Sequence, residues 1–371
     1  QNLLDSYLGR QEALRQIHFP KDWEHYAKAR ERLACEELFL FHLGLQRGQR
    51  QQEGFAHQPD GELAARYLRQ LPFELTEDQK EALRQVAEDM EAGQPMRRLI
   101  QGEVGSGKTV VAEYGAVKAV ASGGQVAMMV PTEVLARQMA QRLEKSLGSL
   151  GIRVALLIGN MKAKEQQAVR ETLAEGEIDV VVGTHALITD KVEYRNLTLA
   201  IVDEQHRFGV RQRAALLGKG NPDLLVMSAT PIPRSLALTV YGDLDTTEIR
   251  QLPANRQPVD TRLINPERRD DVYRFVLSRV KQGEQAYVVF PLVEESEHMD
   301  LKAAVQEMEE LQKGLLAEAR VGLIHGQMGR EKDEVFQAFA RGELDVLIAT
   351  TVVEVGMNVP NATVMVIENA E

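Results

Sequence analysis

Apolar positions in the first 70 residues recur with the spacing of an amphipathic helix. Leu33, Leu38 and Leu45 follow this spacing, and Pro20 stands where the helix would begin. The polar run at residues 46–61 then predicts a loop. We expect residues 1–70 to form a helical connector that packs against the rest of the chain and carries no chemistry of its own.

From about residue 71 the pattern changes to short apolar runs that alternate with helical patterns. Such alternation predicts βαβ units and a parallel sheet that is buried on both faces. Prolines cluster at residues 251–264 and predict a linker, after which the alternation restarts. We therefore expect an α/β protein with one domain at residues 71–254 and a second at 255–371. The runs read RRLIQ, GQVAMMVPT, VALLIG, IDVVVGTH, LTLAIVDE and DLLVMSAT before the linker, and AYVVFPLV, RVGLIHG, LDVLIATT and TVMVIENA after it.

Two segments far apart in the chain carry a similar phrase. Residues 173–185 read LAEGEIDVVVGTH and residues 339–351 read FARGELDVLIATT, with six of the thirteen positions identical. Each copy predicts a helix end, a Gly-Glu turn, a strand, and a threonine at the carboxyl end of that strand. The period is too long for a solenoid. The repeat therefore predicts two related α/β domains in tandem.

The run GEVGSGKT at Gly102–Thr109 matches the phosphate-binding pattern G-x-x-x-x-G-K-T and lies between an apolar run and a helical one. Glycines let such a loop turn its amides toward phosphate oxygens, and the following helix presents its positive end to the same anion. We expect Lys108 to reach the β- and γ-phosphates and the hydroxyl of Thr109 to help hold Mg²⁺.

A pair of carboxylates follows another apolar run, LAIVDEQH at residues 199–206. We expect Asp203 to orient the Mg²⁺ shell and Glu204 to position and polarise the attacking water. Together, the glycine loop and the acidic pair predict a nucleotide hydrolase. They do not distinguish a motor from a P-loop kinase or a transport ATPase, which share both elements.

Charge and cysteine content restrict the compartment and the kind of partner. The formal net charge is −11, so any contact with nucleic acid must come from local clusters or backbone amides. Cys35 is the single cysteine, which excludes an internal disulfide and suits a reducing cytoplasm. No run approaches the roughly 18 apolar residues of a membrane span. We expect a cytoplasmic protein without a membrane partner and, lacking any oligomer signal, a monomer.

Further motifs stand at predicted strand and helix ends. LTEDQ predicts a helix start capped by Thr76, with Gln79 able to pair with adenine. PTEVLARQ at 131–138 and GTHAL at 183–187 end strands on the side where parallel sheets bind ligands, and they suit contacts with DNA phosphates. SATPIPR at 228–234 could sense the nucleotide site and pass a signal to parts that contact DNA.

In this order the motifs resemble those of the superfamily 2 helicases and, within them, the RecG family of branched-DNA helicases. The resemblance extends from about Ile17 to Glu371. It implies tandem RecA-like motor domains with ATP between them, which move DNA to remodel stalled forks and Holliday junctions in repair and recombination. The strings that carry it are IHFP, LPFELTEDQ, GEVGSGKTVVA, PTEVLARQ, VDEQHRFGVRQR, SATPIPR and EVGMNVPNA, of which DEQHRFGV is the most specific.

The resemblance also implies site residues, with ATP and Mg²⁺ as cofactors and branched DNA as the partner. Thr109 and Asp203 are the residues expected to bind Mg²⁺. The expected catalytic residues are Lys108, Thr109, Asp203, Glu204, Gln205 and His206. The expected ATP-binding residues are Gln79, Gly102, Glu103, Val104, Gly105, Ser106, Gly107, Lys108 and Thr109. The expected DNA-binding residues are Thr132, Arg137, Gly183, Thr184, Thr350 and Thr351, and the expected coupling residues are Ser228, Ala229, Thr230 and Gly356.

Some parts of the family pattern have no counterpart in this sequence. In the family, an oligonucleotide-binding wedge domain precedes the motor, and a glutamine- and arginine-rich motif follows in the second motor domain. We therefore expect a fragment with an incomplete second motor domain. Such a fragment should bind ATP and show little DNA-stimulated hydrolysis, which a phosphate-release assay would measure.

Two other interpretations stay open. The transcription-repair coupling translocase Mfd is similar in this region, although Gln205 and Ser106 stand where we expect glutamate and an aromatic residue in that family. Binding to an RNA polymerase subunit, as against forked DNA, separates the two. The third interpretation is a nucleotide-gated DNA-binding module without motor activity. Glu204→Gln should trap ATP in a motor and barely change a simple switch.

Overall fold

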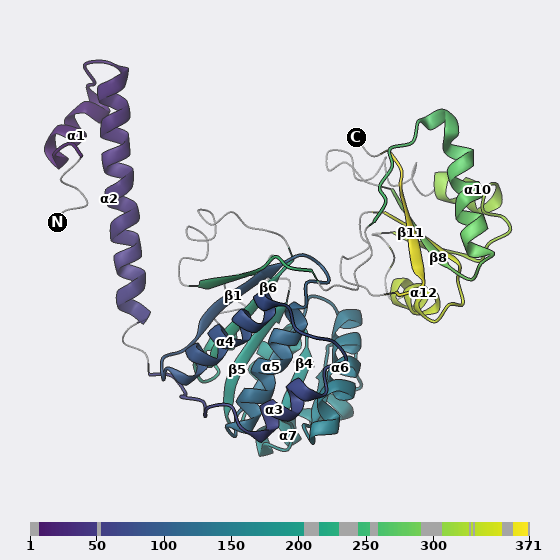
Figure 1. Ribbon diagram of the computed structural model, residues 1–371, viewed down its shortest axis with the longest axis horizontal. Coiled ribbons are helices and arrows are strands. Elements are labelled where there is room, and N and C mark those ends of the chain that lie inside the picture. The colour runs from purple at the N-terminus through teal and green to yellow at the C-terminus, as the bar shows by residue number, and fades with distance from the viewer. Residues whose placement is uncertain are drawn as a thin grey trace. The chain divides into compact units, whose positions relative to one another are not determined.

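A computed structural model shows that the chain divides into two compact units, Gln1–Arg256 and Gln257–Glu371, which are described separately (Figure 1). The sequence placed a domain boundary at residue 254, close to this division. The further separation of residues 1–70 as a connector stays a prediction. The structure describes residues 7–49, 53–203, 215–229, 244–252, 259–290, 306–325, 328, 331–350 and 359–369.

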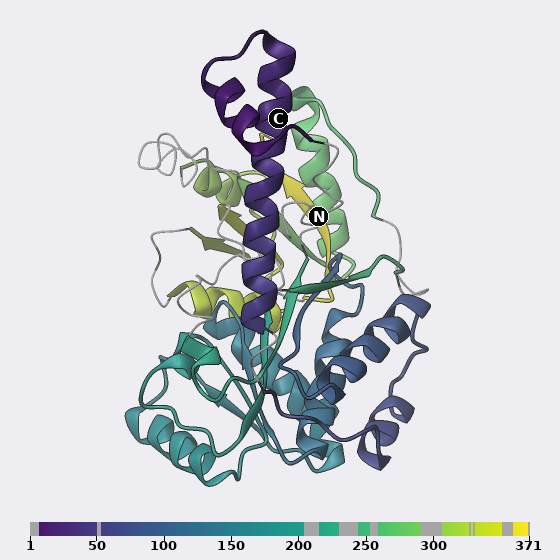
Figure 2. The same ribbon diagram turned by 90° about the vertical axis from the view of Figure 1, so that its left-hand side faces the viewer.

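Two helices at the N-terminal end, α1 (Arg10–His18) and α2 (Trp23–Gln49), pack against each other (Figure 2). Arg32 on α2 donates to the carbonyl of Leu8 at 3.0 Å and pairs with Glu36 at 2.7 Å. The predicted helix is confirmed, but it runs past residue 46, where a loop was expected. Glutamine and arginine are good helix formers, so the polar run alone did not end it. No helix in the described part of the chain has the length and apolar content to cross a membrane.

The first unit is built on a seven-stranded parallel sheet with the order β3-β4-β2-β5-β6-β1-β7. The strands β2, β4 and β6 are buried along their whole length, as a parallel sheet covered on both faces requires. The strands are β1 Arg97–Gly102, β2 Gln125–Met129, β3 Val154–Leu157, β4 Val180–Gly183, β5 Leu197–Asp203, β6 Asp223–Ser228 and β7 Asp245–Ile249.

Helices cover both faces of this sheet because successive side chains of each strand point to opposite sides. Ile100 and Met128 belong to the core under α4, α5 and α6, whereas Leu99 and Ala127 belong to the core on the side of α7. The helices are α3 Glu62–Arg69, α4 Glu77–Glu91, α5 Lys108–Ala121, α6 Glu133–Leu147 and α7 Ala163–Glu175, with short 3-10 turns η1 Gly148–Leu150 and η2 His185–Ile188.

The second unit has a four-stranded parallel sheet with the order β11-β8-β10-β9. Its core packs Tyr273 and Val276 of α10 against Val288 and Ile348 of the sheet. The strand order reproduces the run β5-β2-β4-β3 of the first unit, so the predicted tandem α/β arrangement is confirmed. The elements are η4 Pro266–Arg268, α10 Arg269–Val280, β8 Gln285–Phe290, β9 Val321–Ile324, α12 Glu331–Ala340, β10 Val346–Thr350 and β11 Ala362–Ile367.

The repeat between the units extends to individual hydrogen bonds. In the first unit, Asp179 accepts the backbone N–H of Arg153 at 2.8 Å, and the Arg153 guanidinium reaches both Asp179 and the carbonyl of Gly176. In the second unit, Asp345 accepts the backbone N–H of Arg320 at 2.8 Å. The Arg320 guanidinium also donates to Asp345 and to the carbonyl of Gly342. Each set fastens the turn after a helix to the strand beside it.

A buried glutamine repeats in the same way. The Nε2 atom of Gln125 donates to the carbonyls of Leu173 at 2.9 Å and Ile178 at 2.8 Å. The Nε2 atom of Gln285 donates to the carbonyls of Phe339 and Leu344, both at 2.7 Å. These bonds hold the two similar segments of the sequence at equivalent places in the two units.

The Asp345 carboxylate makes the stability of the second unit depend on acid pH. The Arg320 side chain beside Asp345 holds the pKa of that carboxyl below its ordinary value of 3.8. Its contribution is therefore full above the unfolded-state pKa and is lost as pH falls through the folded-state pKa. We expect Asp345→Asn to remove a modest part of the acid sensitivity of β9 and β10, measured by their hydrogen exchange at pH 5 and below. A variant with unchanged acid sensitivity would contradict this role.

Candidate nucleotide site

Three neighbouring strands of the first unit end together and bring the main motifs to one edge of the sheet. Gln101, just before the glycine loop, lies opposite Ser228 in the register of β1 and β6. Asp203 at the end of β5 lies opposite Met227 of β6. The glycine loop, Asp203 and Ser228 therefore share the carboxyl edge, where ligands bind in open parallel sheets.

The glycine loop between β1 and α5 contacts the side chain of Lys108 through two of its carbonyls. Gly105 and Gly107 have φ of 84° and 93°, a left-handed conformation that favours glycine. Lys108 begins α5, and its ammonium donates to the carbonyls of Gly102 at 2.7 Å and Glu103 at 3.0 Å. The positive end of α5 and the lysine thus lie at the same loop, which is the arrangement that binds phosphate.

Gln79 connects the start of α4 to the glycine loop. The predicted cap is confirmed, because the Thr76 side chain accepts the N–H of Gln79 and the Gln79 side chain accepts the N–H of Thr76. The Nε2 atom of Gln79 also donates to the carbonyl of Ser106 at 2.8 Å, and Gln79 is buried. Adenine pairing by Gln79 stays a prediction; it would use the second N–H and the second lone pair of this amide.

The close approach of Gln79 to the loop leaves no room for a side chain at Gly107 unless the Gln79 amide moves and gives up its contact with Ser106. A Cβ atom at Gly107 would lie 2.2 Å from Nε2 of Gln79, whereas a Cβ at Gly105 would meet nothing within 4 Å. We expect Gly107→Ala to lower the free energy of unfolding by about 1–3 kcal/mol more than Gly105→Ala, since both add backbone strain and only one collides. Urea unfolding without nucleotide measures this, and equal losses would show that the contact with Gln79 is unimportant.

The donors available to a nucleotide-bound metal are hard oxygen atoms. Thr109 offers a hydroxyl in the first turn of α5, and Asp203 offers a carboxylate at the end of β5. Mg²⁺ prefers a few such oxygens and takes its remaining ligands from phosphate and water, so these donors fit it. The predicted catalytic residues Glu204, Gln205 and His206 lie outside the described residues.

The predicted DNA-binding threonines Thr184 and Thr350 occupy equivalent strand ends in the two units. Thr184 is 2% exposed and Thr350 is fully buried, and neither Oγ1 atom has a hydrogen-bond partner in the described part of the chain. Gly183 has no room for a side chain, because a Cβ there would lie 2.1 Å from the carbonyl oxygen of Leu157. Contact between these hydroxyls and a DNA phosphate therefore requires the surrounding residues to move.

The other predicted DNA-binding and coupling residues lie at a helix cap, on the surface, at a buried strand end, or outside the described residues. Thr132 is the N-cap of α6 and accepts the N–H of Leu135 at 3.4 Å, while Arg137 on the same helix is exposed. Ser228 is buried at the end of β6, and Ala229 follows it half-buried. Thr230, Thr351 and Gly356 lie outside the described residues.

The sequence analysis missed a set of buried polar side chains on α5, the helix that follows the glycine loop. Lys118 donates to the carbonyl of Gln58 at 3.0 Å, to Asp60 at 2.9 Å and to Glu91 at 2.6 Å, and is 1% exposed. Glu113 accepts from Tyr67 and pairs with Arg142. The signal was present, since a glutamate and a lysine interrupt the otherwise apolar helical run TVVAEYGAVKAVA.

A second buried pair joins the segment before α3 to the sheet. His57 and Asp223 approach within 3.0 Å, and Asp223 also accepts the backbone N–H of Met96 at 2.6 Å. Burial raises the pKa of the Asp223 carboxyl. With Lys118, this pair fastens residues 53–60 to the first unit, so that segment is part of the unit.

Family models match both units. Residues 76–239 match the DEAD/DEAH box helicase model, and residues 267–371 match the helicase conserved C-terminal domain. The two models together cover most of the chain. Each falls largely within one of the two compact units.

Individual relatives narrow the family. The ATP-dependent DNA helicase RecG of Thermotoga maritima is 48% identical over 98% of this chain and 47% of its own length. RecG of Streptococcus pneumoniae is 47% identical over 100% of this chain and 56% of its own length. A solved structure of RecG bound to a three-way DNA junction matches with a TM-score of 0.81 and 44% identity, over 99% of this chain and 49% of that one. The chain thus spans about half the length of these relatives, and it belongs to the RecG family of ATP-dependent DNA helicases.

Proposed function

We propose that this chain is the ATP-driven motor part of a branched-DNA helicase that remodels stalled replication forks and Holliday junctions. One observation carries the proposal beyond family membership. Thr184 and Thr350 stand at equivalent strand ends, and each has a buried hydroxyl without a partner in the described residues. An unsatisfied buried hydroxyl costs about 1–3 kcal/mol, so two at matching positions favour a shared function. We propose that they bind DNA phosphates once the surrounding residues move.

The residues of the first unit suit ATP as the fuel. The amides of the glycine loop and the Lys108 ammonium would bind the phosphates once Lys108 leaves the carbonyls of Gly102 and Glu103. Thr109 and Asp203 would hold Mg²⁺, which neutralises phosphate charge when it is bound. Glu204 would orient the attacking water.

A cycle of ATP binding and hydrolysis would alternate the grips of the two units on DNA. Ser228 lies at the same sheet edge as the glycine loop and Asp203, so it can respond to whether the bound nucleotide is ATP or ADP. Ala229, Thr230, Gln205, His206 and Gly356 are proposed to pass that response to the DNA contacts. Thr132, Arg137, Gly183 and Thr351 complete the proposed contacts to the DNA backbone. Both grips lie on one chain, which supports action as a monomer.

Branched DNA is the proposed substrate of a protein that contains this chain at the length of its relatives. The three-way junction bound by the structurally similar RecG supports this class of substrate. The test is strand separation of a synthetic three-way junction by the full-length protein with ATP and Mg²⁺. We expect ATP-dependent separation and none with Glu204→Gln, which should still bind ATP. Steady ATP consumption without any separation of the junction would contradict the proposal.

A further inference from the structure

The first turn of α4 carries two adjacent side chains that reach two different parts of the chain. Gln79 donates to the carbonyl of Ser106 in the glycine loop at 2.8 Å. Asp78, its neighbour, accepts the backbone N–H groups of Arg250 and Gln251 on one carboxylate oxygen, both at 2.8 Å. The backbone N–H of Asp78 in turn donates to the side-chain oxygen of Gln251 at 3.4 Å.

The position of Arg250 and Gln251 gives these contacts their importance. They directly follow β7, the last strand of the first unit, and that unit ends at Arg256. The chain continues from there into the second unit. Asp78 therefore holds the start of the segment that joins the two units, on the same helical turn that contacts the glycine loop.

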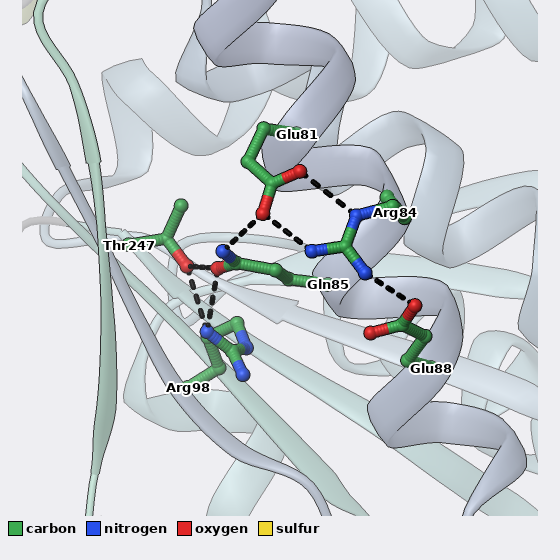
Figure 3. A network of polar contacts seen from close by, with 6 residues as sticks. All are labelled: Glu81, Arg84, Gln85, Glu88, Arg98 and Thr247. Carbon is green, nitrogen blue, oxygen red and sulfur yellow. Dashed lines mark hydrogen bonds and ion pairs between the residues drawn. The ribbon is translucent and has the colours of Figure 1, made fainter.

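The rest of α4 fastens β7 as well, so the strand before this segment is a fixed base. Figure 3 shows Arg98 of β1 and Thr247 of β7 meeting Gln85 of α4. Arg98 donates to Gln85 at 2.9 Å and to Thr247 at 2.7 Å, and its Nε pairs with Asp89 at 2.6 Å. Arg98 is 8% exposed. This buried network fixes β7, whereas Asp78 is a half-buried carboxylate that holds the residues beyond it.

An aspartate in the first turn of a helix ordinarily complements the helix dipole or caps the helix's own amides. At α4 the capping is done by Thr76 and Gln79, which satisfy each other's N–H groups. The Asp78 carboxylate instead accepts hydrogen bonds from another part of the chain. Hydrogen bonds to a charged carboxylate are stronger than neutral ones, so two of them on one oxygen make an effective clamp.

We propose that Asp78 is a positioning residue that couples the nucleotide site to the segment joining the two units. A nucleotide that shifts the loop carbonyl of Ser106 moves Gln79, and the rigid capped turn carries Asp78 with it. The hold on Arg250 and Gln251 then changes with nucleotide state. This proposal rests on the proposed function in that the ligand is ATP, whereas the clamp itself is independent of it.

The test is hydrogen exchange of residues 245–252 in this chain, with and without an ATP analogue and Mg²⁺. Asp78→Ala is compared with Glu77→Ala, which removes a carboxylate of the same helical turn that pairs with Lys80 on its own helix. Without nucleotide, we expect Asp78→Ala to speed exchange of the Arg250 and Gln251 amides about tenfold, Asp78→Asn to speed it less, and Glu77→Ala to leave it unchanged.

Nucleotide binding is measured in the same samples with a fluorescent ATP analogue. We expect nucleotide to change exchange of residues 245–252 in the parent and in Glu77→Ala, and not in Asp78→Ala, with all three binding nucleotide within about threefold of one another. If nucleotide changes the exchange of residues 245–252 equally in Asp78→Ala and in the parent, the proposed coupling is wrong. If no protein binds nucleotide, the proposed function fails. If the nucleotide-free difference between Asp78→Ala and Glu77→Ala is absent, the clamp fails.

Discussion

Replacing Lys108 with alanine is expected to weaken ATP binding by about 10- to 100-fold, because a hydrogen bond from a charged donor contributes about 1.5–3 kcal/mol. The Lys108 ammonium already lies at the glycine loop, 2.7 Å from the carbonyl of Gly102 and 3.0 Å from that of Glu103. It needs only a local movement to reach a phosphate held by the same loop. The measurement is titration with a fluorescent ATP analogue in the presence of Mg²⁺.

The matched control for this variant is Lys164→Ala. Lys164 is an exposed residue of α7, so its removal lowers the positive charge equally without touching the loop. We expect its ATP affinity to stay within about twofold of the parent, since exposed charges contribute little. Equal weakening in the two variants would mean that Lys108 acts only through net charge, and the phosphate-binding role would be wrong.

Replacing Lys118 with methionine is expected to lower the free energy of unfolding of the first unit by about 2–3 kcal/mol. The ammonium is 1% exposed and is satisfied by Gln58, Asp60 and Glu91. Removing one partner of a buried pair costs about 3–5 kcal/mol. The loss here should be smaller because the carboxylates are 43% and 36% exposed and regain water. Urea unfolding measures it.

The same substitution should release the segment that carries Asp60 from α5. We expect limited proteolysis to cut within residues 53–60 faster in Lys118→Met than in the parent. Adding Glu91→Gln should recover part of the lost stability, because the two residues interact and their effects are not additive. A double variant whose loss equals the sum of the two single losses would show that the contact contributes little.

The central sheet could be predicted from the sequence because its strands are apolar on both faces. Strands such as β2 and β4 are short unbroken apolar runs, and each is followed by a helix or a motif at its carboxyl end. The glycine loop could be found for a similar reason, since left-handed backbone at Gly105 and Gly107 needs glycine and leaves a pattern. The tandem repeat was visible because the same turn and strand recur.

The edge strand β7 was not predicted. Its sequence is DTTEI, which is mostly polar. An edge strand pairs with a neighbouring strand on one side only, so part of it faces solvent. Its place beside β1 depends on Arg98 and Thr247, which are far apart in the sequence. The sequence around each residue gives no sign of which residue it contacts.

The contacts of Asp78 and Lys118 were missed for the same physical reason. Asp78 looks like an ordinary acidic residue at a helix start, and its partners Arg250 and Gln251 come after the whole first sheet. Lys118 gave a local signal as a charge within an apolar helix, but nothing nearby identifies Asp60 as its acceptor. Polar contacts between distant segments become visible only when the fold is known.

The most direct test of the central claim is whether nucleotide and branched DNA affect each other's binding to this chain. Affinity for a labelled synthetic fork is measured with and without a non-hydrolysed ATP analogue and Mg²⁺, in the parent and in Lys108→Ala. Two sites on one motor must be thermodynamically coupled. We expect the analogue to change fork affinity about fivefold or more in the parent and not in Lys108→Ala. Fork affinity that is the same with and without bound analogue in the parent would contradict it.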